Sequence, residues 1–362
     1  MSKAKLPALV AFLIVVGLYL MVKSVPAITD PREDFGPRPI PRFVPVLPGD
    51  AVGINMHPER YDDATADTHF EKAKELGITQ IRVAVEWSAI EPKKGQWNFE
   101  PMDRVIRRAK KHDVKVLEVL CYNTLWNETI EGNTKSMPKD LDAWREFVRR
   151  MAQRYKGDVT WWEIWNEENA GWLAGPYEQY PHRRWTDYRD LLKIAYQTLK
   201  QVNPKNVVLF GGLAHDSDDW WKDLEAYYRV EAPQYCDVIA IHPYPGGANP
   251  LANEWYPRYI DEILAVMANH GDGGKPVWIT EVGYLTAEAA TNLVVTEAQQ
   301  ADYLADLFLV ALSRRQIQKV FFYTMWDEES HGLYRRDWSP KPAAARMKRL
   351  MNAGMNSLKT VK

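Results

Sequence analysis

Residues Trp161–Asn169 read WWEIWNEEN and mix three tryptophans with carboxylate and amide side chains. Together with the two residues before it, the stretch begins as an apolar run, VTWWEIWN, of a length suited to a buried strand. A carboxylate in such a strand is costly unless it is paired or carries out chemistry, because burial removes it from water. The stretch therefore predicts a buried strand whose end carries a functional site.

Seven further apolar runs flank this strand, and longer amphipathic stretches separate them. The eight runs are AVGIN, QIRVAVEW, VKVLEVL, VTWWEIWN, NVVLFGG, DVIAIHPY, PVWITEVGY and KVFFYTMW. The helical patterns are Phe70–Leu76, Met102–Lys111, Asp142–Tyr155, Tyr188–Val202, Trp220–Tyr228, Tyr259–Asn269, Ala298–Arg314 and Ala343–Met351. Strict alternation of eight strands and eight helices predicts an α/β fold of the (β/α)8 TIM-barrel type. No change in composition divides this region, so we expect one catalytic domain over residues 46–362.

The N-terminus has the pattern of a membrane segment. Lys3 and Lys5 precede an uncharged apolar run, Leu6–Val22, that is long enough to span a bilayer. We expect residues 1–25 to be a transmembrane anchor rather than a cleaved signal, because Lys23 and Pro26 suit a cleavage site poorly. The barrel would then lie on the outer, periplasmic or extracellular, face of the membrane, or be secreted if cleavage occurs. Residues 26–45 are rich in proline and predict a stiff linker.

Charge and cysteine content exclude several classes of function. The formal net charge is −2, and basic residues alternate with acidic ones along the predicted helices, so no nucleic-acid partner is expected. Cys121 and Cys236 show no metal-binding spacing and are expected to be buried thiols. We expect neither a metal ion nor another cofactor. Most of the fifteen tryptophans are expected to pack in the core, although tryptophan also stacks well on sugar rings.

The predicted barrel locates the active site at the C-terminal ends of its strands. Two carboxylates occupy such positions on opposite sides of the barrel mouth, Glu167 after the fourth strand and Glu281 in the seventh. Strand alternation predicts that both point inward, because Trp161, Glu163, Trp165 and Glu167 share one face. Two carboxyl groups that face each other across a cleft suit glycoside hydrolysis, in which one donates a proton and the other attacks or activates water.

The strings WEIWNE in the fourth strand and ITEVGY in the seventh together resemble the pattern of glycoside hydrolase clan A. Their spacing most resembles family 39, and the similarity extends from about Gly53 to Trp338. The resemblance implies a retaining glycosidase that acts by double displacement, with Glu167 as acid/base and Glu281 as nucleophile. It also implies that Asn166 binds the 2-hydroxyl group of the sugar.

Other residues at the strand ends fit supporting roles in substrate binding. They are Arg82, His57, Asn123, His242, Tyr244 and Trp326. Arg82 would lower the pKa of Glu281, or would instead pair with the deeper Glu163 and be structural. His242 and Tyr244 would hydrogen-bond the nucleophile or the sugar, and Trp326 would form an apolar floor. His57 and Asn123 are weaker candidates for contacts with sugar hydroxyl groups.

The sequence also departs from the family pattern. Glu168 stands where proline commonly follows the catalytic glutamate, which predicts either a raised pKa for Glu167 or a side chain in solvent. Too little chain remains for the β-sandwich that many family 39 enzymes carry.

The substrate expected is a β-linked oligo- or polysaccharide, and an exopolysaccharide is one candidate. A transglycosylase with the same two glutamates and a non-catalytic carbohydrate-binding barrel stay open as alternatives. A metal-dependent hydrolase is disfavoured, because His57 and His242 have no partner at ligand spacing.

Overall fold

The computed structural model describes residues 50–215 and 220–359. The expected membrane segment (1–25) and linker (26–45) lie outside the described residues, as does the proposed start of the domain at residue 46, so these boundaries stay predictions. Within the described part of the chain, no helix is both long enough and apolar enough to cross a membrane.

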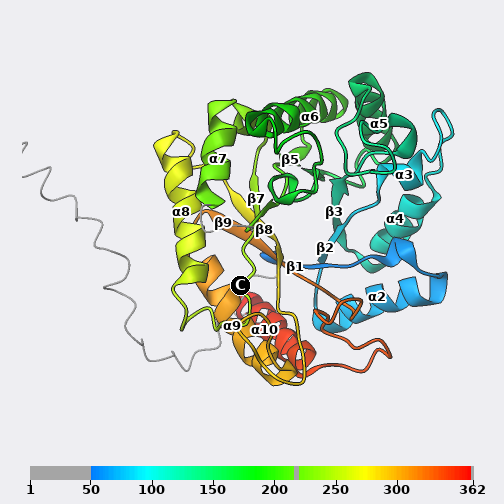
Figure 1. Ribbon diagram of the computed structural model, residues 1–362. Helices are drawn as coiled ribbons and strands as arrows, with labels where there is room; N and C mark the ends of the chain where they lie inside the picture. The colour runs from blue at the N-terminus through cyan, green and yellow to red at the C-terminus, as the bar shows by residue number, and fades with distance from the viewer. Residues whose placement is uncertain (1–49, 216–219, 360–362) are drawn as a thin grey trace, which may run out of the picture. The chain divides into compact units, whose positions relative to one another are not determined.

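Nine parallel strands form one sheet that curls into an α/β barrel-like fold (Figure 1). The strands are β1 (Val52–Asn55), β2 (Gln80–Val83), β3 (Lys115–Leu120), β4 (Trp161–Ile164), β5 (Val207–Leu209), β6 (Leu213–Ala214), β7 (Ile239–His242), β8 (Val277–Val282) and β9 (Ile317–Phe322). Their order in the sheet is β5-β4-β3-β2-β1-β9-β8-β7-β6. Each of the eight predicted runs contains one strand, and β6 follows directly after the fifth run. The prediction of a parallel α/β barrel-like fold is therefore confirmed.

Strands β5 and β6 together occupy one place in the ring. β5 pairs with β4, β6 pairs with β7, and a parallel bridge from Leu209 to Val238 links β5 to the chain that enters β7. Gly211 and Gly212 separate the two short strands. A Cβ atom on Gly212 would lie 1.9 Å from Nε2 of His242, and one on Gly211 would lie 2.3 Å from Oε2 of Glu168. The strand is interrupted by glycines because two acidic or basic side chains fill the space beside it.

Helices surround the outer side of the sheet (Figure 1). They are α2 (Asp63–Leu76), α3 (Trp87–Ile90), α4 (Glu100–His112), α5 (Leu141–Arg154), α6 (Pro181–Val202), α7 (Trp220–Arg229), α8 (Trp255–Asn269), α9 (Glu297–Leu312) and α10 (Pro342–Lys359). Short 3-10 turns occur at η2 (Pro58–Arg60), η3 (Leu125–Asn127), η4 (Glu168–Ala170) and η5 (Ala232–Tyr235). Local sequence explains several helix ends: the Asp62 side chain accepts a hydrogen bond from the Thr65 amide, and Thr296 forms a capping box with Gln299.

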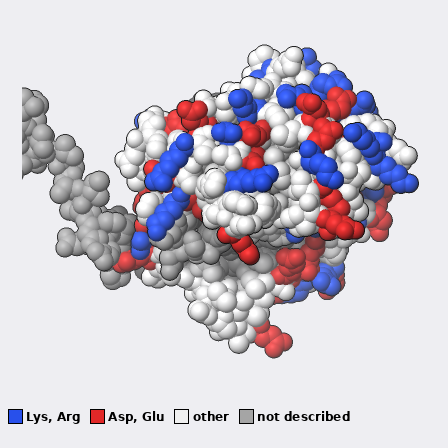
Figure 2. Space-filling model, turned by 45° about the horizontal axis from the view of Figure 1, so that its top comes forward, with Lys and Arg blue, Asp and Glu red and all other residues white. Residues whose placement is uncertain are grey.

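The core has two layers. Inside the ring, a small cluster packs from several strands and comprises Leu117, Leu209, Val238, Ala240, Trp278 and Phe321, with Trp161 against it. A larger layer lies between the sheet and the helices and includes the fully buried Trp87, Trp144, Trp162 and Trp165. Both cysteines are buried thiols, as predicted. On the surface in Figure 2, basic and acidic side chains are interspersed, in agreement with the sequence pattern.

Candidate active site

The end of β4 changes direction before it reaches Glu167. The strand ends at Ile164, and Trp165 and Glu167 both adopt positive φ angles, of 69° and 48°. Trp165 consequently packs against Trp144 of α5, on the outer side of the sheet. The prediction that Trp165 shares the inward face of Glu163 is therefore wrong, because the strand alternation ends at Ile164. The left-handed turns nevertheless bring Glu167 to the mouth of the ring.

Arg82 on β2 is the centre of a polar cluster inside the ring. Its guanidinium donates two hydrogen bonds of 2.9 Å to the carboxylate of Glu163. It also donates to Oδ1 of Asn55 at 3.0 Å and to Oδ1 of Asn166 at 2.8 Å. A further bond of 2.5 Å reaches Oε1 of Glu281. Arg82 therefore does both things that the sequence left open: it pairs with the deeper Glu163 and contacts Glu281.

Glu281 lies on β8 and is held in its ionised form. Besides the contact with Arg82, its Oε2 accepts a hydrogen bond of 2.8 Å from the Tyr244 hydroxyl group. Burial by itself would raise the pKa of Glu281. The positive charges of His242 and Arg82, together with the hydrogen bonds from Tyr244 and Arg82, outweigh burial and lower this pKa well below its ordinary value. Glu281 is therefore a carboxylate at neutral pH, as a nucleophile must be.

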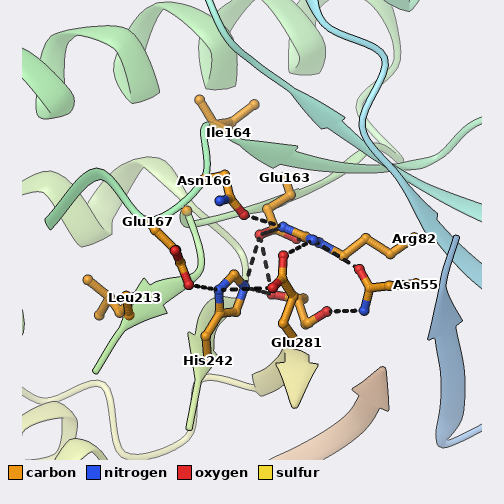
Figure 3. A network of polar contacts seen from close by, with 12 residues as sticks. Asn55, Arg82, Glu163, Ile164, Asn166, Glu167, Leu213, His242 and Glu281 are labelled. Atoms are coloured by element: carbon orange, nitrogen blue, oxygen red, sulfur yellow. Dashed lines mark hydrogen bonds and ion pairs between the residues drawn. The ribbon is translucent and has the colours of Figure 1, made fainter. Parts of the chain in front are cut away.

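His242, at the end of β7, lies between the two glutamates (Figure 3). Its Nδ1 is 2.9 Å from Oε1 of Glu167 and 3.9 Å from Oε2 of Glu281. Its Nε2 is 3.0 Å from Oγ1 of Thr280, and that hydroxyl group donates to Glu163. Since Thr280 gives its proton to Glu163, its oxygen is left to accept a hydrogen bond from Nε2–H of His242. In the neutral imidazole, Nδ1 is then an acceptor that faces Glu167.

The charge of His242 depends on both carboxylates. Burial would lower the pKa of this fully buried imidazole, but the charge of Glu281 and the hydrogen bond and charge of Glu167 raise it. Glu167, His242 and Glu281 each offer a ligand-type atom, and these atoms lie within 4.8 Å of one another. Among the described residues, they form the group whose spacing would suit a metal ion. The same atoms already contact Arg82, Tyr244 and each other, an arrangement that suits proton transfer and nucleophilic attack.

A cavity of about 600 Å³ opens above this cluster. It is lined by Arg82, Asn166, Glu167, Tyr244 and Glu281, and by the aromatic side chains of Tyr122, Trp172 and Tyr323. His57, His331 and Lys135 also line it. The predicted residues Arg82, Asn166, Glu167, Tyr244, Glu281 and His57 are thus brought together, and His242 lies directly behind them. A cavity of this size accommodates one or more sugar rings.

Two of the predicted residues lie elsewhere. Asn123 is fully buried and donates to the backbone carbonyls of Asn127 and Ser136, so it holds a loop together. Trp326 stacks on Trp338, with ring centroids 5.4 Å apart, and is absent from the described lining of the cavity. The prediction that Trp326 forms the apolar floor of the cavity is therefore corrected. Tyr323, the residue directly after β9, lines the cavity instead.

Three aromatic residues of the cavity are not among the site residues predicted from the sequence. Tyr122 and Trp172 stack on each other, with centroids 5.7 Å apart, and Tyr323 lies on the far side near Tyr244. Tyr122 was visible as a polar residue at the end of a strand. Trp172 belongs to the loop after β4, and nothing in the sequence distinguishes it from the other aromatic residues of that loop.

Glu168 has neither of the environments expected from the sequence. Its side chain is fully buried, and the hydroxyl group of Tyr227 beside it favours the ionised form less than burial disfavours it. It lies in a pocket where Tyr188 and Tyr227 are its aromatic neighbours and Gly211 leaves room for its Oε2. Burial raises the pKa of Glu168 itself to about 8. It is therefore mainly neutral at neutral pH and places little negative charge beside Glu167.

Comparisons with known proteins extend over most of the chain. The family model described as cellulase (glycosyl hydrolase family 5) matches residues 47–330. β-Galactosidase BgaA of Clostridium cellulovorans is 26% identical over 237 residues, which cover 58% of this chain and 33% of that protein. Endo-1,4-β-xylanase 2 of Claviceps purpurea is 29% identical over 242 residues, covering 64% of this chain and 66% of the xylanase. The chain thus spans only a third of the first relative and just under two thirds of the second.

Solved structures give the same fold. A family 39 glycoside hydrolase from the gut symbiont Bacteroides cellulosilyticus WH2 superposes with a TM-score of 0.66 and 22% sequence identity. The match covers 85% of this chain and 64% of that one. At this identity the likeness concerns the fold.

Proposed function

This chain belongs to the cellulase family, glycosyl hydrolase family 5, and we propose that it is a retaining glycoside hydrolase that cleaves β-glycosidic bonds of an oligo- or polysaccharide. The observation that carries the proposal is the pair Glu167 and Glu281 at the mouth of the ring. Glu281 is held ionised by Arg82 and Tyr244, and Glu167 contacts the imidazole of His242.

The first step forms a covalent intermediate. Glu281 attacks the anomeric carbon while Glu167 donates its proton to the departing glycosidic oxygen, so that bond formation and bond cleavage occur on opposite faces of the carbon. Asn166 Oδ1 accepts from Arg82, and its Nδ2 donates to Tyr122 at 3.2 Å. This amide is thus oriented at the cavity surface, where it binds the 2-hydroxyl group of the reacting sugar.

The second step uses the same residues in reverse. Glu167, now a carboxylate, removes a proton from water as the water attacks the anomeric carbon, and Glu281 leaves as a carboxylate. Arg82 and Tyr244 again stabilise the charge that returns to Glu281. The imidazole of His242, which lies 2.9 Å from Glu167, accepts or shares a proton as Glu167 changes charge.

Retention is supported by the distance between the two glutamates. Their nearest ligand-type atoms lie within 4.8 Å of one another. Retaining glycosidases hold the two carboxyl groups about 5–5.5 Å apart, whereas inverting enzymes separate them by about 6.5–9.5 Å to admit water. The present spacing is closer to that of the retaining enzymes.

The substrate proposed is a β-linked polysaccharide of the kind processed outside the cell, and an exopolysaccharide is one candidate. The β-galactosidase and the xylanase named above support a β-linked glycan without identifying its sugars. A transglycosylase would use the same residues and differ only in whether a second sugar or water intercepts the intermediate. Analysis of the products separates these two outcomes.

The test is reducing-end release by the purified protein on β-glucans, xylans, mannans, galactans and bacterial exopolysaccharides, with Glu281→Gln as control. We expect release by the parent and none by the variant. Proton NMR of the first product should show the β anomer before mutarotation. An α product would disprove retention, and equal release by the variant would disprove the role of Glu281.

A further inference from the structure

One wall of the cavity is a continuous surface that leads away from the catalytic residues. It begins at Asn166, whose Nδ2 donates to the hydroxyl group of Tyr122 at 3.2 Å. Tyr122 in turn stacks on Trp172, with an angle of 18° between the ring planes. All three residues line the cavity beside Glu167. A sugar next to the reacting ring would therefore contact this wall.

Lys135 lies at the far end of this wall. Its Nζ is 3.4 Å from the centroid of the Trp172 ring and 5.8 Å from that of Tyr122, and it lines the same cavity. The ammonium group thus covers the indole face on which a sugar ring would otherwise stack.

The backbone holds Lys135 and Trp172 in this arrangement. The amide of Ala174 donates to the carbonyl of Lys135 at 2.8 Å, and the amide of Met137 donates to the carbonyl of Ala174 at 3.1 Å. The carbonyl of Trp172 accepts a hydrogen bond of 2.7 Å from Nε1 of the buried Trp165. Backbone hydrogen bonds therefore join the loops after β3 and β4, and they hold the ammonium of Lys135 at the cavity.

Across residues 50–215 and 220–359, Lys135 has no carboxylate partner, because no ion pair within 4.0 Å involves its Nζ. The catalytic acids are engaged by Arg82 and His242. The two other acids of the cavity, Glu86 and Glu329, also form no ion pair with Lys135 within 4.0 Å in the described part of the chain. Among the described residues, this ammonium in the substrate cavity contacts the rings of Trp172 and Tyr122, and it is ready to bind an anion.

We propose that Lys135 binds the carboxylate of an acidic sugar residue, so that the cavity takes an anionic, uronate-containing glycan. This inference rests on the proposed function, because it assigns the chemical class of that enzyme's substrate. A sugar that approaches Trp172 must move the ammonium off the indole face. A neutral sugar replaces the cation–π contact with hydroxyl groups, whereas a uronate gives the displaced ammonium an opposite charge.

The test compares two ligands that differ only at C6, a β-1,4-linked oligoglucuronate and the cello-oligosaccharide of the same length. Their binding to the full chain carrying Glu167→Gln is measured by titration calorimetry at low and high salt. We expect the acidic ligand to bind about five- to tenfold more tightly at low salt, as for a partly buried ion pair, and less so at high salt. Adding Lys135→Gln should abolish this preference, and Lys135→Arg should keep most of it.

Lys139→Gln is the matched control, because it removes the same charge from an exposed lysine four residues away that is absent from the described cavity lining. Equal affinity for the two ligands, no binding of the acidic one, or a preference that survives Lys135→Gln would overturn the inference. The proposed function fails separately: it is lost if the parent hydrolyses no glycan, even if the Lys135-dependent preference is observed. If the parent hydrolyses a glycan but shows no Lys135-dependent preference, the inference about Lys135 fails and the proposed function stands.

Discussion

At the scale of single residues, the two glutamates of the site differ in their hydrogen-bond partners. Glu281 receives hydrogen bonds from Arg82 and Tyr244, whereas Glu167 contacts His242. The first environment stabilises a carboxylate, and the second places an imidazole beside the carboxyl group, with which it can exchange a proton. Different chemical roles follow from these contacts, and they predict different responses to substitution.

Replacing each glutamate by alanine should separate the roles. In Glu167→Ala, hydrolysis of a natural glycan should fall on the order of 10²–10⁴-fold, because proton donation is lost. The formation of the glycosyl-enzyme from a dinitrophenyl glycoside should be nearly unchanged, since that leaving group departs without a proton. In Glu281→Ala both should be lost. Stopped-flow release of dinitrophenolate measures the difference, and an equal loss in the two reactions of Glu167→Ala would contradict the assignment.

Glu168 should make stability depend on pH. Its carboxyl group has a pKa of about 8 in the folded chain and close to the ordinary value of 4.5 in the unfolded chain, so the unfolded chain loses this proton first as the pH rises. Stability therefore falls as pH rises from about 4.5 to 8, with an upper bound of roughly 5 kcal/mol. Glu168→Gln should unfold at higher urea concentration than the parent at pH 7.5, and the gain should shrink at pH 4.5. Glu178→Gln, on an exposed glutamate, serves as the control. A gain that is independent of pH would argue against a neutral buried carboxyl group.

At the scale of elements, the sheet is interrupted where side chains need space. Gly211 and Gly212 divide the fifth place of the ring into β5 and β6, next to Glu168 and His242. The sequence predicts one strand here, in the run NVVLFGG, which ends in two glycines. It gave no reason for them, because the reason lies in side chains that come from β4 and β7.

Gly212→Ala should displace His242. The new methyl group would lie 1.9 Å from Nε2 of His242, so the imidazole must move away from Thr280 and Glu167. We expect a loss of about 1–3 kcal/mol in stability, as for an overpacked core, and at least a tenfold fall in kcat. Gly274→Ala is the control, since nothing lies within 4 Å of its Cβ position. Unchanged activity of Gly212→Ala would show that the position of His242 is unimportant.

At the scale of the whole molecule, the ring brings distant parts of the chain to one site. Arg82 and Glu281 are 199 positions apart and share a hydrogen bond, and Asn55, Glu163 and Asn166 join the same cluster. A parallel ring with its strand ends on one side gathers such residues whatever their separation in sequence. The polar cluster therefore forms because the strands close into a ring.

The location of the whole protein is also a proposal, based on the sequence of residues 1–25. We expect the full chain to sediment with membranes and to resist extraction at alkaline pH, because an apolar run of this length inserts into a bilayer. A chain that starts at residue 46 should remain in the soluble fraction with unchanged kcat. Protease added to spheroplasts or protoplasts should digest the catalytic domain, because it would lie on the outer face of the membrane. A full chain found in the soluble fraction would argue against an anchor.

The linear pattern of residues was sufficient to predict the order of strands and helices, and it pointed to the two glutamates and to most of the residues that the structure places beside them. Apolar runs report burial, and polar residues at their ends report the edge of a parallel sheet, so both are readable locally. Three-dimensional packing set the rest. Because of this packing, Trp165 points outward and Tyr323, rather than Trp326, lines the cavity. The same packing buries Glu168 and places Arg82 between Glu163 and Glu281. These outcomes depend on backbone turns at strand ends and on contacts between distant residues, neither of which leaves a local trace in the sequence.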